Sequence, residues 1–160
     1  MRYYTYIRNR SAMSVNLEVK GTLARLLATE DLLVEHKNVS TASFNVQTRV
    51  LTLPRWEKAS NNVFNLLISH EVAHALFTPD EDYRKKSKVP MGFLNVTEDV
   101  RIEILMKKKY SGLPKTFYNG YQELNDQDFF GIAEEDVTSL NIADRVNLHF
   151  KIGNFVKVPF

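Results

Sequence analysis

The stretch LLISHEVAHALFTPDED, residues Leu66–Asp82, is the part of the sequence from which the fold and the chemistry are best inferred. It contains two of the four histidines of the chain, His70 and His74, with Glu71 between them. At 3.6 residues per turn, a step of four residues places two side chains on one face of a helix. Both imidazoles can therefore reach a single divalent cation.

The same stretch also contains a base for hydrolysis. Glu71 flanks the two histidines, so its carboxylate reaches a water molecule at the metal more readily than the metal itself, as in the zinc motif HExxH. The alternative is a pair of core histidines that each have a hydrogen-bond partner. We predict His70 and His74 as metal ligands and Glu71 as the catalytic residue. The surrounding apolar residues fit a buried helix: Leu66, Leu67, Val72, Ala73 and Leu76.

A catalytic zinc site needs a third protein ligand and one open position. The chain has no cysteine, and its other histidines, His36 and His149, are distant in sequence. The segment FLNVTEDVRIEIL (93–105) offers two adjacent acids on the next expected helix, Glu98 and Asp99. The third ligand is therefore expected to be a carboxylate.

Helical faces distinguish these two acids. Glu98 shares a face with apolar residues such as Leu94 and Ile102, so we predict it as the third ligand. Asp99 shares a face with Asn95 and Glu103, which indicates greater exposure, and Asp99 is the alternative ligand.

Upstream of the motif, the spacing of apolar residues predicts one or two helices over Ser14–His36. Two short strands with a turn near Gln47–Thr48 follow within Ser40–Trp56. Pro54 cannot donate a ladder hydrogen bond, so the second strand, RVLTLP, is expected at or near a sheet edge, where it could pair with an extended substrate.

The rest of the chain reads mainly as helix. Ser60 is a good N-cap for a helix over 61–77, which carries the motif. A polar loop (78–92) and a second helix (93–110) follow, with Gly112 as a C-cap. Residues 141–153 are a further candidate helix, and 154–160 look strand-like. We expect an α+β fold, mainly helical, with a small sheet beside the HExxH helix.

Composition limits the class of protein. The 160 residues suit one domain (1–160), and the unfinished C-terminal segment suggests a fragment of a longer chain. A net charge of +2 gives no electrostatic case for a nucleic acid partner. The sequence contains no run of eighteen apolar residues, so it predicts no membrane-spanning helix. The absence of cysteine suits a reducing cytoplasm.

The order of these motifs resembles the gluzincin class of zinc peptidases, which implies that the expected α+β fold is zincin-like. NVTEDVRIE (95–103) is similar to metallopeptidase-like proteins associated with von Willebrand A domains, including the cobaltochelatase subunit of that type. From about Leu27 to Gly153 the chain resembles HExxH peptidases encoded by tailed bacteriophages. One departure stands out, because the gluzincin pattern has an aspartate four residues after the ligand glutamate, and here that position is Ile102. The partner that orients the first histidine is then Asp99, Glu103 or Asn95.

These observations lead to the expected function, a zinc-dependent metalloendopeptidase that acts on protein or peptide in the cytoplasm. The resemblance to bacteriophage peptidases implies that this is the cytoplasm of an infected bacterial host. Zn²⁺ is the expected cofactor, and Glu71 acts as general base on the attacking water. Donors considered for the oxyanion are His149, Tyr118, Tyr121 and Arg101. The alternative is a metal-containing binding or assembly module without proteolysis, which works with a partner ATPase or a C-terminal von Willebrand A-like domain.

Overall fold

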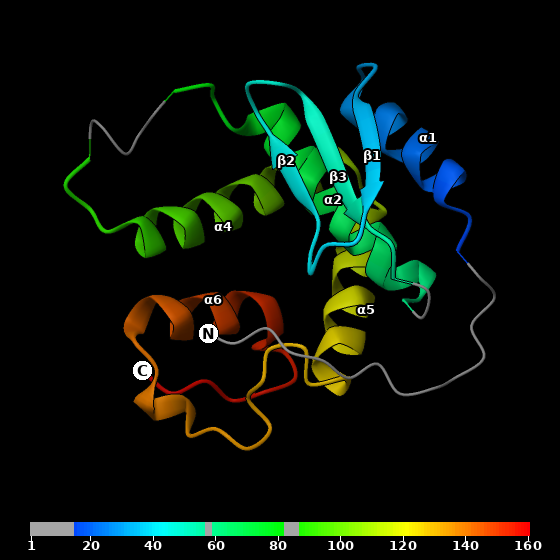
Figure 1. The fold of residues 1–160 in the computed structure, drawn as a ribbon. Coiled ribbons are helices and arrows are strands. Elements are labelled where there is room, and N and C mark those ends of the chain that lie inside the picture. Colours follow the sequence, from blue (N-terminus) through cyan, green and yellow to red (C-terminus); the bar gives the residue numbers. More distant parts are fainter. Residues whose placement is uncertain (1–14, 57–58, 82–86) are drawn as a thin grey trace.

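The structure, a computed structural model, describes residues 15–56, 59–81 and 87–160. Within these residues the fold is α+β, with five α-helices, one short 3₁₀ helix and a three-stranded sheet (Figure 1). This confirms the expected mainly helical fold with a small sheet. The elements in chain order are α1 (Leu17–Ala28), β1 (Leu33–Lys37), β2 (Ser43–Asn45), β3 (Val50–Pro54), α2 (Asn61–Phe77), α4 (Met91–Lys109), α5 (Leu113–Asp126), η1 (Val137–Ser139) and α6 (Ile142–Ile152).

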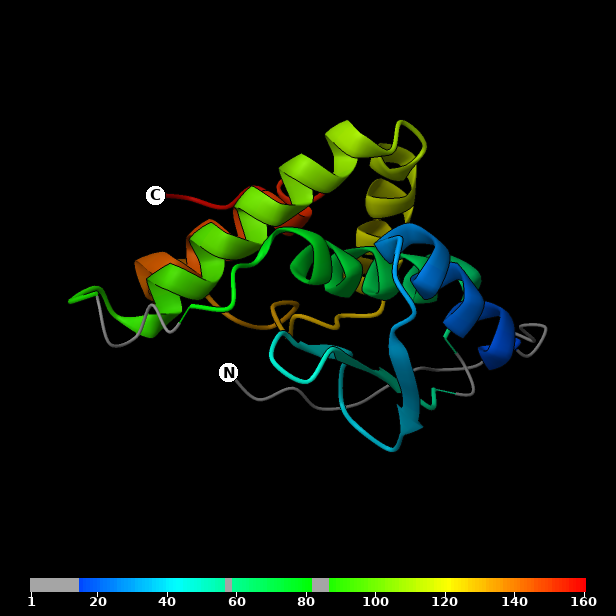
Figure 2. The ribbon, with the colours of Figure 1, turned by 90° about the horizontal axis from the view of Figure 1, so that it is seen from above.

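Helix α2, which carries the HExxH motif, is the central element of the fold. Ser60 caps it as expected, because its Oγ accepts a hydrogen bond from the Val63 N–H at 3.2 Å. Ten of the 17 residues of α2 are buried, as in a helix that is covered on several sides. Figure 2 shows α2 between the sheet and α4, and α1 and α5 also pack against it. The HExxH motif is therefore held by the core.

Helix α5 approaches α2 closely at a glycine. A Cβ atom on Gly120 would lie 2.6 Å from Leu66 Cβ and 3.1 Å from the Asn62 carbonyl oxygen. At the start of α2, the Ser60 hydroxyl and the Asn62 amide both donate hydrogen bonds to the Glu123 carboxylate of α5. These contacts fix the position of α2 relative to α5.

The sheet differs from the prediction in two respects. Residues 33–37 form strand β1 and not the end of a helix, because α1 stops where Thr29 takes a left-handed conformation (φ 57°). The strand order is β1-β3-β2, so β3 is central, parallel to β1 and antiparallel to β2. The expectation of an edge position for RVLTLP is therefore wrong. Pro54 is the last residue of β3, and the Arg55 N–H continues the pairing with Lys37 (3.0 Å).

Other boundaries are close to those expected. The predicted turn at 47–48 joins β2 to β3, and Asn45 Oδ1 accepts hydrogen bonds from both of its N–H groups. Helix α4 begins two residues earlier than expected, and α6 ends at Ile152 as predicted. Gly112 precedes α5 instead of capping α4, which ends at Lys109 with Tyr110 as its C-cap. Residues 154–160 contain no strand, and part of the predicted loop, 82–86, lies outside the described residues.

Candidate metal centre

Three partly buried side chains from two helices converge where α2 faces α4. His70 and His74 lie on successive turns of α2, and their ring centroids are 5.1 Å apart. Asp99, from the facing side of α4, places its Oδ1 3.6 Å from His70 Nε2 and 3.4 Å from His74 Nε2. One ligand atom from each of the three residues lies within 4.8 Å of the others. Two nitrogens and one carboxylate oxygen therefore surround a common point.

The spacing of these atoms fits a bound cation. Ligand bonds of about 2.0–2.2 Å in a tetrahedral zinc site separate neighbouring donor atoms by about 3.3–3.6 Å. The two distances from Asp99 Oδ1 to the imidazoles fall in this range and exceed those of good N–H···O hydrogen bonds. The donor set, two imidazoles and one carboxylate, is also typical of catalytic zinc with one position left for solvent. The group can hold a divalent metal ion.

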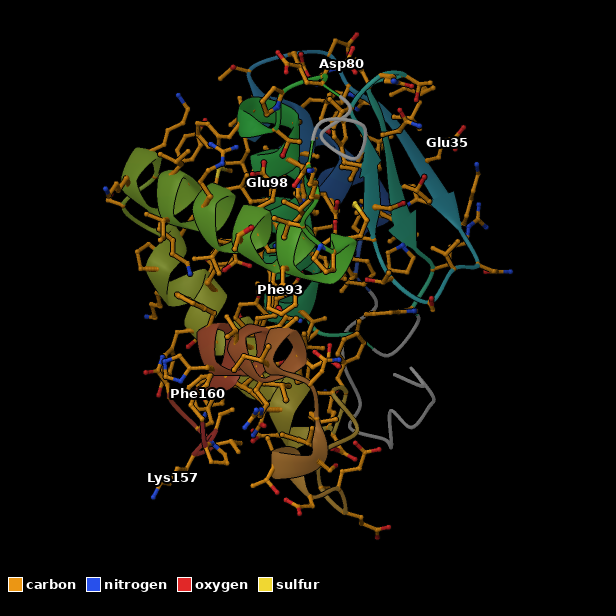
Figure 3. All side chains as sticks on the ribbon, turned by 90° about the vertical axis from the view of Figure 1, so that its left-hand side faces the viewer. Glu35, Asp80, Phe93, Glu98, Lys157 and Phe160 are labelled. Carbon is orange, nitrogen blue, oxygen red and sulfur yellow. The ribbon has the colours of Figure 1, made fainter. Side chains whose placement is uncertain are left out.

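The third member of the group is Asp99, the alternative ligand predicted from the sequence, and Glu98 does not join it. The buried stripe of α4 runs through Val96, Ile102 and Met106, and Asp99 and Glu103 lie on this stripe. Glu98, labelled on α4 in Figure 3, lies to one side of this stripe. Arg101 donates hydrogen bonds to both oxygens of its carboxylate. The expectation that the face of Asp99 and Glu103 is the more exposed one is therefore wrong, because both carboxylates face the histidines of α2.

Glu103 orients the first histidine. Its Oε1 accepts a hydrogen bond from His70 Nδ1 at 2.9 Å, which leaves Nε2 free to face Asp99. The buried Tyr121 hydroxyl donates to the same oxygen at 2.5 Å, and Lys107 Nζ lies 3.2 Å from Oε2. Glu103 was one of three residues predicted for this role, and it follows Asp99 by four residues. The two acids of α4 that face His70, Asp99 and Glu103, are therefore four residues apart, and the position four residues after Glu98 is still Ile102.

Burial and neighbouring charges shift the pKa values of Glu103, His70 and Asp99. Burial raises the pKa of Glu103, but the hydrogen bond and charge of His70, with Lys107 and Tyr121, bring it below its ordinary value. Burial lowers the pKa of His70, yet Glu103 and the charge of Glu71 raise it overall. Burial likewise raises the pKa of Asp99, and the neighbouring imidazoles and Lys151 hold it well below the usual range. The two α4 acids therefore remain anionic beside the histidines.

Glu71 lies on α2 beside the two imidazoles and is only 8% exposed. Burial raises the pKa of its carboxyl, and the charge of Asp99 adds to this rise, while His70, His74 and Lys151 partly offset it. A carboxylate with a raised pKa is a stronger base than an exposed one. The position and environment of Glu71 are therefore those of a candidate general base.

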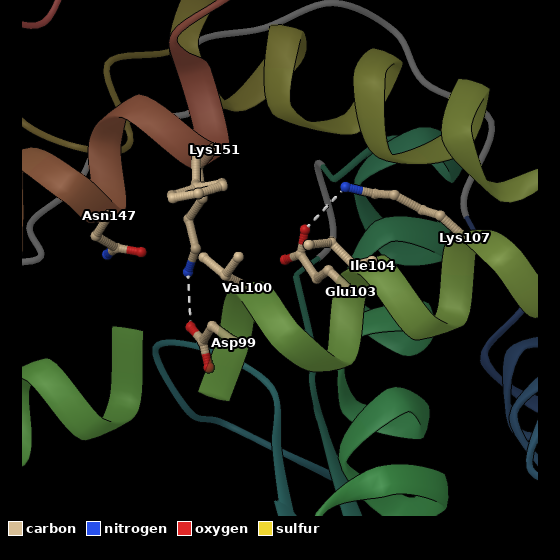
Figure 4. A pocket seen from close by; sticks show the side chains of 8 residues that line it. Asp99, Val100, Glu103, Ile104, Lys107, Asn147 and Lys151 are labelled. Carbon is tan, nitrogen blue, oxygen red and sulfur yellow. Dashed lines mark hydrogen bonds and ion pairs between the residues drawn. The ribbon is translucent and has the colours of Figure 1, made fainter. Parts of the chain in front are cut away.

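A lysine from α6 completes the group. Lys151 Nζ lies 3.1 Å from Asp99 Oδ2, the oxygen that does not face the imidazoles. Figure 4 shows this ion pair at the pocket between α4 and α6, where Lys107 also reaches Glu103. Lys151 was not singled out from the sequence, because 52 residues separate it from Asp99. Only the packing of α6 on α4 brings the two together.

The residues that the sequence suggested as oxyanion donors have other contacts. Tyr121 and Arg101 donate to the carboxylates of Glu103 and Glu98. The rings of Tyr118 and His149 pack against aromatic rings near the C-terminus, with centroid distances of 4.9 and 5.3 Å.

Comparison of the chain with protein-family models, with curated proteins and with solved structures finds no match. Among the described residues, no helix is long and apolar enough to cross a bilayer.

Proposed function

We propose that the protein is a zinc-dependent metallopeptidase in which His70, His74 and Asp99 hold the ion. The observation that carries this proposal is the convergence of two Nε2 atoms on Asp99 Oδ1, at 3.4 and 3.6 Å, beside a buried glutamate. A structural metal needs no general base, whereas hydrolysis does. The HExxH spacing, the acid from the next helix and the buried Glu71 support a hydrolytic site together.

In the proposed reaction the chain's own residues move the proton. A bound Zn²⁺ ion supplies Lewis acidity, which acidifies water and polarises the peptide carbonyl. Glu71 takes the proton of the attacking water and passes it to the leaving amine. Glu103 keeps the His70 ring in place during this transfer, because it holds Nδ1.

Lys151 is the proposed donor to the oxyanion. Its ammonium group already lies beside Asp99, so a cation is present at the edge of the metal group without a change of fold. A positive charge at a developing oxyanion, in a partly buried site, stabilises the transition state strongly. The side chain of Lys151 is 18% exposed, so water screens its charge less than that of a surface lysine.

The substrate-binding strand is proposed to be β2. The strand expected for this role, β3, has both of its edges paired, with β1 and β2. Strand β2 (Ser43–Asn45) forms one edge of the sheet and packs against α2, which carries the histidines. An extended peptide could add to this edge by main-chain hydrogen bonds. Such pairing suits unfolded or loop segments of proteins as substrates.

The decisive experiment combines metal analysis with a single substitution. The purified native chain and its Glu71→Gln variant are compared for bound metal and for cleavage of a dye-labelled unfolded protein. We expect about one zinc ion per chain in both and a loss of cleavage of about 10²–10⁴-fold in the variant. Glu35→Gln, on the outer strand β1, is the matched control and should retain full activity.

Two results would contradict the proposal. A native chain that binds no divalent metal would exclude the metal centre itself. Equal metal content with no cleavage by either form would favour the alternative, a metal-containing assembly module that works with a partner protein. Metal analysis also separates zinc from iron and manganese, since a site with two histidines and one carboxylate suits all three.

A further inference from the structure

The second histidine of the motif is the inner end of a chain of hydrogen bonds that leads away from the metal centre. His74 Nδ1 lies 2.8 Å from Thr78 Oγ1, and Thr78 Oγ1 lies 2.7 Å from Glu98 Oε1. Arg101 holds both oxygens of Glu98, with Nε 2.8 Å from Oε2 and Nη2 2.7 Å from Oε1. We call His74, Thr78, Glu98 and Arg101 the His74 relay.

The direction of donation in the relay follows from chemistry. A glutamate bound by a guanidinium through both oxygens is an anion and can only accept hydrogen bonds. The single proton of the Thr78 hydroxyl must therefore point to Glu98. The Thr78 oxygen is then left as an acceptor, and only a protonated Nδ1 of His74 can donate to it. The neutral imidazole consequently carries its lone pair on Nε2, the atom that faces Asp99.

The relay is anchored at the end of α2. The Thr78 N–H donates to the His74 carbonyl oxygen at 3.0 Å, so the backbone of Thr78 is tied to the last turn of the helix. Arg101 also donates to the Phe77 carbonyl oxygen at 2.6 Å. The hydroxyl and the carboxylate are thus held in position by α2 and α4, and neither depends on a bound ligand.

We propose that Thr78 and Glu98 are positioning residues that fix the tautomer of His74 and so prepare Nε2 to bind the metal. This inference rests on the proposed metal centre and explains why Glu98 lies beside that centre without entering it. The two histidines are then oriented by different acids, His70 directly by Glu103 and His74 through Thr78 by Glu98. Loss of such an outer partner typically weakens metal binding about 10–100-fold.

The test reads the tautomer in the metal-free protein. The chain has four histidines, so ¹⁵N-histidine labelling gives four imidazole spin systems, and a His74→Asn variant identifies that of His74. Spectra are recorded about two pH units above the ordinary pKa of histidine, where neutral rings dominate. Zn²⁺ affinity is measured in parallel by competition with a chromogenic chelator.

Three threonine variants separate positioning from a structural effect. Thr78→Val removes the hydroxyl at nearly constant volume, and Thr78→Ser restores it. Thr97→Val is the matched control, because the Thr97 hydroxyl on α4 donates only to backbone carbonyls, at 2.9 and 3.0 Å. We expect a proton on Nδ1 of His74 in the native, Ser and control forms. In Thr78→Val we expect the proton to shift toward Nε2, with zinc affinity about 10–100-fold weaker.

Each contrary outcome points to a separate failure. A native His74 that carries its proton on Nε2, or a Thr78→Val variant with unchanged tautomer and unchanged affinity, overturns the relay. A native chain that binds no zinc, but has the Nδ1 proton that Thr78→Val displaces, overturns the proposed function and supports the relay. If Thr78→Val does not fold, Glu98→Ala decides the question, because it removes the outer acceptor and should also mix the tautomers.

Discussion

Asp99 and Glu103 lie on successive turns of α4, and their carboxylates face the two different ring nitrogens of His70. Asp99 Oδ1 is 3.6 Å from Nε2, and Glu103 Oε1 is 2.9 Å from Nδ1. The shorter contact is a hydrogen bond, whereas the longer one has the separation of two ligands on one cation. In the proposed site the same pair of acids, four residues apart, would therefore serve two functions, Asp99 as a ligand and Glu103 as the group that orients the ring.

Replacement of the two neighbouring acids should separate the ligand from the positioning residue. We expect Asp99→Asn to weaken zinc binding by more than about 100-fold, because it removes an anionic ligand. Glu98→Gln should weaken it less than about tenfold, since the Gln carbonyl can still accept the Thr78 bond. Titration against a chromogenic chelator measures both. The reverse order of losses would make Glu98 the ligand, as the sequence alone suggested.

Removal of the Tyr121 hydroxyl should destabilise the fold more than an equivalent change elsewhere. Tyr121→Phe removes a bond to the buried, charged Glu103, and we expect a loss of about 1.5–3 kcal/mol in the free energy of unfolding. Tyr110→Phe is the control, since that hydroxyl donates to the uncharged Leu27 carbonyl oxygen at 2.7 Å and should cost about 0.5–1.5 kcal/mol. Urea denaturation gives both values, and equal losses would argue against a special role for Glu103.

The effect of Tyr121→Phe should also depend on pH. Although burial raises the pKa of Glu103, His70, Lys107 and Tyr121 lower it below its ordinary value. Stabilisation from these partners is therefore complete above the pKa of the unfolded chain, about 4.3 for glutamate, and is lost as the pH falls through the lower folded value. The stability difference between variant and native protein should narrow in acid, and a difference that grows there would contradict the assigned charge of Glu103.

Two glycines inside helices should respond oppositely to alanine. Gly120→Ala would place a Cβ 2.6 Å from Leu66 Cβ, so α5 must move away from α2, at a cost of about 1–3 kcal/mol. Gly21→Ala meets nothing nearer than Val34 Cγ1 at 3.7 Å and should stabilise the protein by about 0.5–1 kcal/mol through helix propensity. Thermal unfolding checks both signs. A stabilised Gly120→Ala variant would show that α5 and α2 lie farther apart than the distances at Gly120 indicate.

Lys151→Met should reduce catalysis without loss of metal. If Lys151 supports the oxyanion, kcat should fall about 10²–10³-fold. The zinc content should persist, because removing a cation beside the site does not weaken attraction for Zn²⁺. Lys157→Met is the control, since Lys157 is exposed near the C-terminus, away from Glu98 (Figure 3). Parallel loss of metal and activity would instead make Lys151 a residue that only holds Asp99.

Local patterns were the reliable part of the sequence analysis. The Ser60 cap and the bounds of α2 could be read directly, because capping and a buried apolar helix depend on residues close together in the chain. The hairpin turn at 47–48 and the end of α6 were predictable for the same reason. Strand β1 was not, because its apolar residues fit a helix equally well, and pairing with β3 decides the conformation.

The sequence by itself determined that His70 and His74 share one helical face, with Glu71 between them. It also led to the expectation of a carboxylate from the next helix. Only the tertiary structure decided that the carboxylate beside the two imidazoles belongs to Asp99, that Glu98 contacts Thr78, and that Lys151 reaches Asp99. Two residues four positions apart lie on the same face of any helix, whatever packs around it. The face of α4 that turns inward, by contrast, depends on how α2, α5 and α6 pack around it, and polar residues on that face resemble solvent-exposed ones until the packing is known.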